Sequence, residues 1–285
     1  VTGVQTCALP ISLGTYLLLL LFPSMFQQTR HDFSYLVKSL LFIPFDIGSG
    51  AIQPLVRIGW TINCEMLFYL LFFIAFHISM KYRGLICSAF LAILVGMVQI
   101  FAPAISSWQS PIGNVLSPFL IFYGDPVMLE FLFGILAYYL LRYLYRRHTL
   151  HPVSRTVSLV SAVCIPVIFC LLAYFTPRIN VIGFLRLPQW GLPALLLLIL
   201  AFLAGLQLSM PRFFVQLGNI SYSLYLVHYY PVMFLDRVVF DFSTLSVLSV
   251  VGLIVSVVIS IVLAYLCWIL VERKFTGWLR RILLR

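Results

Sequence analysis

Acidic side chains within apolar segments are the first candidates for chemistry. Residues 59–73 read GWTINCEMLFYLLFF, where Glu65 heads an apolar run of membrane-spanning length. Glu65 and Tyr69 are four residues apart, so a helix places both on one face. Ionisable residues in such segments are costly and usually mark function. We therefore predict that Glu65 faces a hydrated pocket near its outer helix end, with Trp60, Asn63 and Tyr69 close by.

A second interpretation of Glu65 stays open. The residue could simply be an acid near a helix N-terminus, stabilised by the helix dipole by about 0.3–1 kcal/mol. Thr61 or Asn63 would then be the N-cap. Trp60 fits an interfacial aromatic anchor on either interpretation.

The stretch GNISYSLYLVHYYP, residues 218–231, carries a second polar set. Ser221, Tyr225 and His228 fall on one helical stripe, and Tyr222 lies on a neighbouring stripe. A hydroxyl, a phenol and an imidazole inside a span are expensive unless they line water, a ligand or each other. The alternative is a polar contact between helices, worth about 0.6 kcal/mol per bond.

Glu130 is a third candidate, in the stretch DPVMLEFLFGILAYYL. Asp125 and Pro126 resemble a helix start, and Gly134 would permit close helix approach. Glu130 either faces a substrate or makes a helix-end or interhelical contact. The basic cluster at 142–155 either reflects topology alone or contacts an anionic donor or lipid headgroup.

Composition places these residues in a bilayer. The 285-residue chain is 62% hydrophobic and 9% charged, with a mean hydropathy of +1.08, whereas soluble domains carry about 25% charged residues. Its apolar runs are long and do not alternate, which predicts helices rather than a barrel. The net charge of +10 is scattered between these runs, as in cytoplasmic loops of membrane proteins, and does not indicate nucleic-acid binding.

The chain therefore predicts an all-α, polytopic transmembrane helical bundle. We expect eight spans, near 13–26, 60–79, 84–102, 126–145, 157–175, 190–208, 217–235 and 245–271. The connection 27–59 contains FSYLVKSLLFIPF, which could form a short interfacial helix. No internal repeat is evident, which weakens a transporter built from inverted repeats.

Lysine and arginine counts predict the orientation. With a cytoplasmic C-terminus, twelve of the eighteen cations fall on the inner side and six on the outer side, as positive-inside loops require. The six cysteines show no CxxC and no metal spacing, so we expect no bound metal and interpret most of them as small apolar residues.

The first residues differ in character from the rest. The stretch VTGVQTCALPIS has no initiator Met, basic region or apolar core, so it is not a signal peptide. It resembles a translated sequencing adapter. We therefore expect 1–12 to be a non-native segment and 13–285 to be a single integral-membrane domain.

Four motifs in order over residues 60–285 resemble the membrane-bound acyltransferase-3 family. Residues 60–69, WTINCEMLFY, resemble its Trp-Ser/Thr-Leu-x-x-Glu-x-x-Phe-Tyr signature, closest to the branch that acylates exopolysaccharide. Residues 130–134, EFLFG, are similar to its middle helix, and residues 220–228, ISYSLYLVH, to its late helix. Residues 270–281, LVERKFTGWLRR, resemble its C-terminal end.

Two small departures from that pattern concern the last two motifs. Pro231 stands three residues after His228 rather than one or two, and Lys274 occupies the usual proline position after Glu-Arg.

The resemblance implies about ten spans, of which the chain would retain the last eight. It implies transfer of an acyl group, commonly acetyl, from acyl-CoA to a sugar hydroxyl of an envelope or exopolysaccharide glycan, with no bound cofactor. The essential His of the family would lie upstream, so we expect the fragment to be inactive alone. Glu65 would support catalysis, and the substrate-binding candidates are Trp60, Asn63, Tyr69, Glu130, Ser221, Tyr222, Tyr225 and His228.

The expected partners are acyl-CoA, a lipid-linked or polymeric saccharide and membrane lipids. The expected location is the bacterial inner membrane. A transporter or flippase with a Glu65–His228 proton relay, and a non-catalytic scaffold, are the alternative functions.

Overall fold

The computed structural model describes residues 12–17, 19–20, 33–45, 54, 57–106, 111–150, 152–175, 183–238 and 247–275. Those residues contain helices and no strand, as predicted. Contacts divide the chain into two compact units, Val1–Asn63 with Pro211–Arg285, and Cys64–Met210. The predicted non-native segment, 1–12, lies outside the described residues except for Ser12, which is helical.

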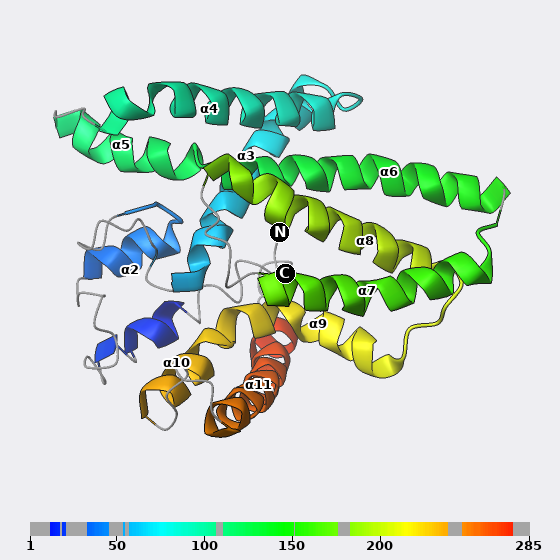
Figure 1. Ribbon diagram of the computed structural model, residues 1–285. Helices are drawn as coiled ribbons and strands as arrows, with labels where there is room; N and C mark the ends of the chain where they lie inside the picture. The colour runs from blue at the N-terminus through cyan, green and yellow to red at the C-terminus, as the bar shows by residue number, and fades with distance from the viewer. Residues whose placement is uncertain are drawn as a thin grey trace, which may run out of the picture. The chain divides into compact units, whose positions relative to one another are not determined.

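The Cys64–Met210 unit contains most of the long helices (Figure 1). They are α3 (Trp60–Ile78, from Cys64 onward), α4 (Arg83–Ser106), α5 (Pro111–Tyr123), α6 (Glu130–Leu150), α7 (Arg155–Phe175) and α8 (Leu192–Gly205). Helix α8 packs against both α6 and α7, and α4 packs against α5 and α6. Residues 79–82 join α3 to α4.

The other unit is built around α11 (Val247–Cys267), which packs against α9 (Arg212–Val227) and α10 (Tyr229–Val238). The buried residues of α11 are all small and recur every three or four positions: Ser249, Gly252, Ser256, Ser260 and Ala264. Small residues let helices approach closely in a membrane, where apolar side chains gain little by leaving lipid. The large Val, Leu and Ile side chains of α11 are instead exposed.

Six helices of the described residues have the length and apolarity of membrane spans. They are Trp60–Ile78, Arg83–Ser106, Pro126–Thr149, Arg155–Phe175, Gly183–Gly205 and Val247–Val271. These correspond to six of the eight predicted spans, and the protein is a multi-pass membrane protein. Of the predicted span 13–26, only 12–17 and 19–20 are described, and both are helical.

The predicted span 217–235 is wrong as a single element, because the structure places two shorter helices there. Helix α9 ends at Val227 and α10 begins at Tyr229, with His228 between them. Pro231 explains the break, since it has no N–H to donate to the carbonyl of Val227 and its ring crowds that carbonyl.

Helix α5 is an element that the sequence analysis did not predict. Its chain returns along α4, where the Gln99 side chain donates a hydrogen bond of 2.9 Å to the Gly124 carbonyl. A Cβ on Gly124 would stand 2.2 Å from Val98, so only glycine permits this close approach to α4. The short helix predicted in 27–59 is present as α2 (Phe33–Leu40).

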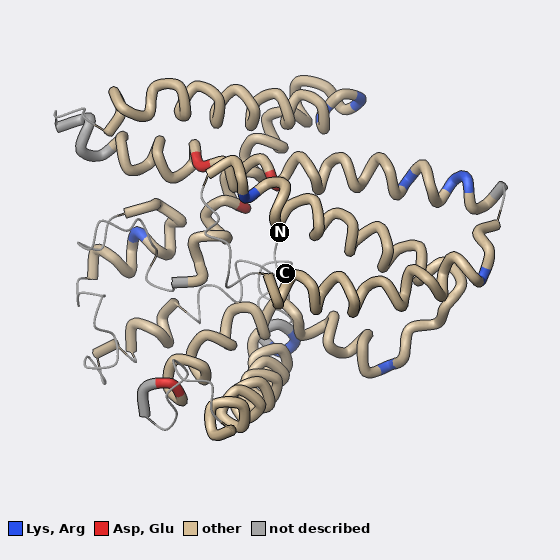
Figure 2. The backbone as a smooth tube through the Cα atoms, in the orientation of Figure 1, with Lys and Arg blue, Asp and Glu red and all other residues tan. Residues whose placement is uncertain are grey.

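Charges in the Cys64–Met210 unit separate along the helices. Figure 2 shows Lys and Arg at the α3–α4 turn and toward the end of α6, whereas the acidic residues lie toward the start of α6. This separation has the form expected of a span bundle with one cationic, cytoplasmic side.

We expect the 150–155 turn to be cytoplasmic and the turn before α8 to face outward. In a background without native cysteines, Phe184→Cys should react with a membrane-impermeant thiol reagent in intact cells, whereas Thr149→Cys should react only after lysis. Both side chains are exposed in the structure, so burial does not account for a difference. Labelling of Thr149→Cys alone would reverse the orientation.

Candidate functional site

Glu65 is hydrogen-bonded inside a membrane-length helix. It lies in the second turn of α3, half-buried, and the phenol of Tyr69 donates to its Oε1. The predicted shared face of these two residues is therefore confirmed. Among the described residues Tyr69 alone bonds to this carboxylate, so the second carboxylate oxygen is open to another donor.

The interpretation of Glu65 as a helix-start acid does not fit the structure. Helix α3 begins at Trp60, after a 3₁₀ turn, and its first turn contains no acid. Thr61 is not an N-cap: it lies inside the helix and donates to the carbonyl of Ile58 at 3.2 Å. Because the dipole effect fades within the first turn, it does not account for Glu65.

Asn63 is a buried amide with an unused donor. Its side chain is 1% exposed, and its Nδ2 has no hydrogen-bond partner among the described residues. A buried unsatisfied donor costs about 1–3 kcal/mol. Residues two apart do not share a helix face, so Asn63 and Glu65 point to different sides of α3.

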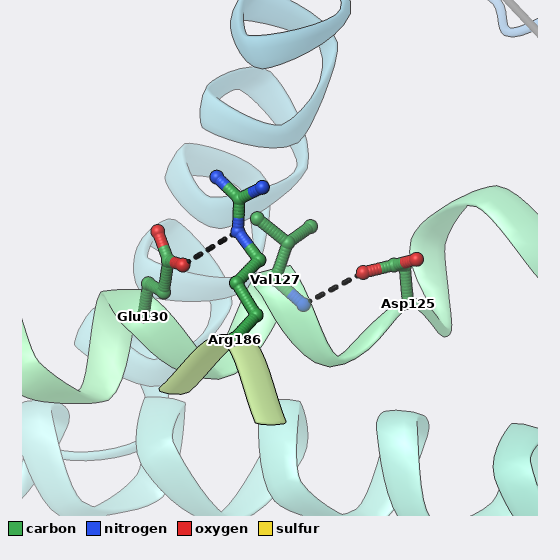
Figure 3. A network of polar contacts seen from close by, with 4 residues as sticks. All are labelled: Asp125, Val127, Glu130 and Arg186. Carbon is green, nitrogen blue, oxygen red and sulfur yellow. Dashed lines mark hydrogen bonds and ion pairs between the residues drawn. The ribbon is translucent and has the colours of Figure 1, made fainter. Parts of the chain in front are cut away.

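Glu130 is part of an ion pair (Figure 3). Arg186 Nε lies 2.8 Å from Glu130 Oε1, and both side chains are about one-third exposed. Asp125 begins the segment as predicted, because its side chain accepts a 2.8 Å hydrogen bond from the Val127 amide. Pro126 follows at the first helical position, where its missing N–H is not needed.

Two features of this region were not anticipated from the sequence. Arg186, which precedes a π-helical turn (Leu187–Gly191) before α8, was counted only as an outer-side cation. The sequence did contain a signal for this ion pair, because an arginine beside an apolar helix needs a counterion. The predicted close approach at Gly134 is wrong, because a Cβ there would meet nothing within 4 Å.

The late polar stripe does not act as one group. Tyr225 bridges to α3, with its phenol 2.7 Å from the Thr61 hydroxyl and 3.2 Å from the Ile58 carbonyl. Ser221 is exposed and donates to the Gly218 carbonyl of its own helix. Tyr225 thus makes a polar contact between helices, which is the alternative that the sequence analysis gave for this stripe.

His228 is held by the last turn of α9. Its Nδ1 lies 2.7 Å from the Tyr225 carbonyl and 3.2 Å from the Leu224 carbonyl. Carbonyl oxygens only accept, so these contacts place the proton on Nδ1 and leave Nε2 of the neutral ring as an acceptor. His228 and the neighbouring Tyr222 are both half-buried.

The candidate residues fall in both compact units. Trp60, Asn63, Ser221, Tyr222, Tyr225 and His228 belong to one, and Glu65, Tyr69 and Glu130 belong to the other. Within the Cys64–Met210 unit, Phe68 stacks on Phe131 with ring centroids 4.6 Å apart, which joins α3 to α6 one residue from Tyr69 and Glu130 respectively.

Comparisons with known proteins agree with the sequence motifs. The acyltransferase-3 family, described as an acyltransferase domain, matches residues 9–269. The chain is 31% identical over 119 residues to the exopolysaccharide production protein ExoZ of Rhizobium meliloti (strain 1021), covering 41% of this chain and 32% of that protein. The match thus spans about a third of that relative's length. No solved structure matches the chain significantly.

We expect the Glu130–Arg186 pair to couple measurably in stability. Glu130→Gln, Arg186→Gln and the double variant should give a coupling free energy of about 0.5–1 kcal/mol, the range for partly exposed pairs. The measurement is the free energy of unfolding in detergent micelles. Arg142→Gln combined with Glu130→Gln is the control and should be additive, and equal coupling in both cycles would contradict the pairing.

Proposed function

The chain belongs to the acyltransferase-3 family, and from this premise we propose that it is a membrane O-acyltransferase that moves an acyl group, commonly acetyl, from acyl-CoA to a sugar hydroxyl. Family membership favours this enzyme over a transporter with a proton relay. The six membrane-length helices are consistent with chemistry carried out within the bilayer.

The acceptor that we propose is an exopolysaccharide or its lipid-linked precursor. Support comes from the relative whose name refers to exopolysaccharide production. The proposed location is the bacterial inner membrane with a cytoplasmic C-terminus, since acyl-CoA is made in the cytoplasm and the cations divide twelve to six.

The reaction requires deprotonation of a weak nucleophile. The acceptor oxygen attacks the thioester carbonyl carbon and loses its proton to a general base. The tetrahedral intermediate then expels CoA thiolate as the carbon–sulfur bond breaks, and the thiolate takes up a proton. A positioned base contributes roughly 10²–10⁴-fold to such a step.

The hydrogen-bonded Glu65 carboxylate within α3 is the observation that carries this proposal. Tyr69 holds one oxygen and fixes the orientation of the side chain. The open oxygen would orient the acceptor hydroxyl, or the imidazole base that the family resemblance implies. A carboxylate beside an imidazole also stabilises the imidazolium formed during proton transfer. Glu65 is thus proposed to support the base rather than to replace it.

The remaining candidates have different proposed roles. The Nδ2 of Asn63, which has no partner among the residues that the structure describes, is proposed to donate to a substrate oxygen, which would relieve the cost of its burial. Glu130 already has Arg186 as its counterion, so we propose that it orders the segment before α8 and contacts substrate through that pair. Tyr225 is proposed to hold α9 against the start of α3.

Glu65→Gln should lower acyl transfer by roughly 10²-fold or more, because the amide keeps the size but loses the charge. Tyr69→Phe should lower it by about tenfold, the effect of losing one hydrogen bond to a charged group. The assay is glycan acetylation in a deletion strain complemented with the complete gene, with protein quantified in the same membranes.

His228→Ala serves as the comparison variant and should lose less activity than Glu65→Gln. A well-expressed Glu65→Gln protein with nearly full activity would remove Glu65 from the reaction. Transfer from labelled acetyl-CoA in isolated membranes tests the donor separately.

A further inference from the structure

A pocket of about 450 Å³ lies between α3, α4 and α6 in the Cys64–Met210 unit. This volume is within the range of roughly 300–1,000 Å³ that is usual for ligand sites. Its walls include Phe68 and Phe72 of α3 and Phe131, Gly134 and Ile135 of α6. Tyr69, the partner of Glu65, also lines it.

The interior offers hydrocarbon contacts and few polar ones. The polar side chains in the lining are Tyr69, Tyr138, Tyr139 and Arg83. The Tyr69 phenol donates to Glu65, and the Tyr138 phenol accepts a 3.0 Å hydrogen bond from Arg142. The pantetheine arm of CoA would have to leave its amides unpaired among these rings, which is costly. An alkyl chain has no polar groups and would not incur this cost.

One end of the pocket, beside Gly84 and Tyr139, is cationic. Arg83 lines it at the start of α4, and Gly84 packs against Tyr139, where a Cβ would stand 2.7 Å from the phenol oxygen. Tyr138, which lines the same pocket, accepts a hydrogen bond from Arg142. Arg83 is thus part of the lining and Arg142 is bonded to a lining residue, and we call this cationic end of the pocket its mouth.

No carboxylate of this unit neutralises that mouth. Between Cys64 and Met210 the acids are Glu65, Asp125 and Glu130. Glu65 is bonded to Tyr69 and Glu130 to Arg186, and Asp125 caps the segment before α6, away from the mouth. Guanidinium groups with no carboxylate partner in this unit fit a phosphate, which they bind through two parallel hydrogen bonds.

The depth of the pocket fits one leaflet. Tyr69 lies nine residues before Ile78, the last residue of α3, and Arg83 follows five residues later. Nine residues span about 14 Å along a helix. One leaflet of the hydrocarbon core is about 15 Å thick, half of the whole. A chain that enters beside Arg83 would thus end near Tyr69.

We propose that this pocket binds one acyl chain of an anionic phospholipid from the leaflet on the cationic side, with its phosphate between Arg83 and Arg142. Basic pockets between spans bind anionic headgroups in this way. The bound chain packs against Tyr69 and so supports the hydrogen bond to Glu65. The inference that the lipid affects acyl transfer rests on the proposed function, whereas the inference that the pocket binds lipid does not.

The test measures lipid retention by native mass spectrometry of the purified full chain. Phosphatidylglycerol should remain bound in preference to phosphatidylcholine with the same acyl chains. Arg83→Gln combined with Arg142→Gln should weaken phosphatidylglycerol binding by roughly tenfold or more.

Gly134→Leu should abolish retention, because a side chain there grows into the pocket without meeting a neighbour. Gly96→Leu is the matched control, since a Cβ at this α4 position also meets nothing within 4 Å and Gly96 does not line the pocket. Gly96→Leu should bind as the unaltered protein does, and elution volume and helix content should match in both variants.

Three outcomes would overturn the proposal. Equal retention of the two phospholipids would remove the headgroup site, and unchanged retention in Gly134→Leu would remove the pocket as the place of binding. Displacement of phosphatidylglycerol by acetyl-CoA or by a polyprenyl phosphate at equal concentration would assign the pocket to that ligand. If the unaltered protein retains phosphatidylglycerol but transfers no acetyl group, only the proposed function is contradicted.

Discussion

The structure depends on the low polarity of the bilayer interior, where every buried polar group needs a partner. Backbone groups meet this requirement within helices, and the two half-buried carboxylates meet it through single defined neighbours. Tyr69 serves Glu65 within one helix, and Arg186 serves Glu130 across the chain. Asn63 and Gln189 are exceptions, since each has a buried polar atom that no described residue satisfies. Where partners are missing in such a medium, a substrate or ligand is a reasonable replacement.

The same medium changes what holds the helices together. Lipid is as apolar as leucine, so large aliphatic side chains gain little from facing a protein interior. The described helices accordingly expose many of them and bury small residues, as the serine and glycine face of α11 shows. The buried serines Ser256 and Ser260 of α11 donate to carbonyls of their own helix at 2.7 and 2.6 Å. Close packing at Gly84 and Gly124 brings α4 against its neighbours and shapes the pocket beside Tyr69.

Polar residues therefore have separable uses in this fold. Tyr225 joins two helices, and His228, at the proline-induced break, bonds to a carbonyl of α9. Neither arrangement requires a substrate. Glu65 differs because its helix position has no structural explanation in the dipole, and because its second oxygen has no partner among the described residues. This difference is why Glu65, and not the late stripe, is the centre of the proposed chemistry.

The sequence alone determined the fold class, the family and most spans, because these depend on composition, local periodicity and short motifs. The Glu65–Tyr69 pair and the Asp125 cap were also predictable, since both are contacts between residues two to four positions apart. Only the tertiary structure decided the partners of Glu130 and Tyr225, which lie 56 and 164 residues away in the chain. It also revealed α5, the break at His228 and the pocket between α3, α4 and α6. Such features depend on which helices pack together. In a membrane protein, apolar side chains that face lipid look the same in the sequence as those that face another helix, so the sequence does not predict this packing.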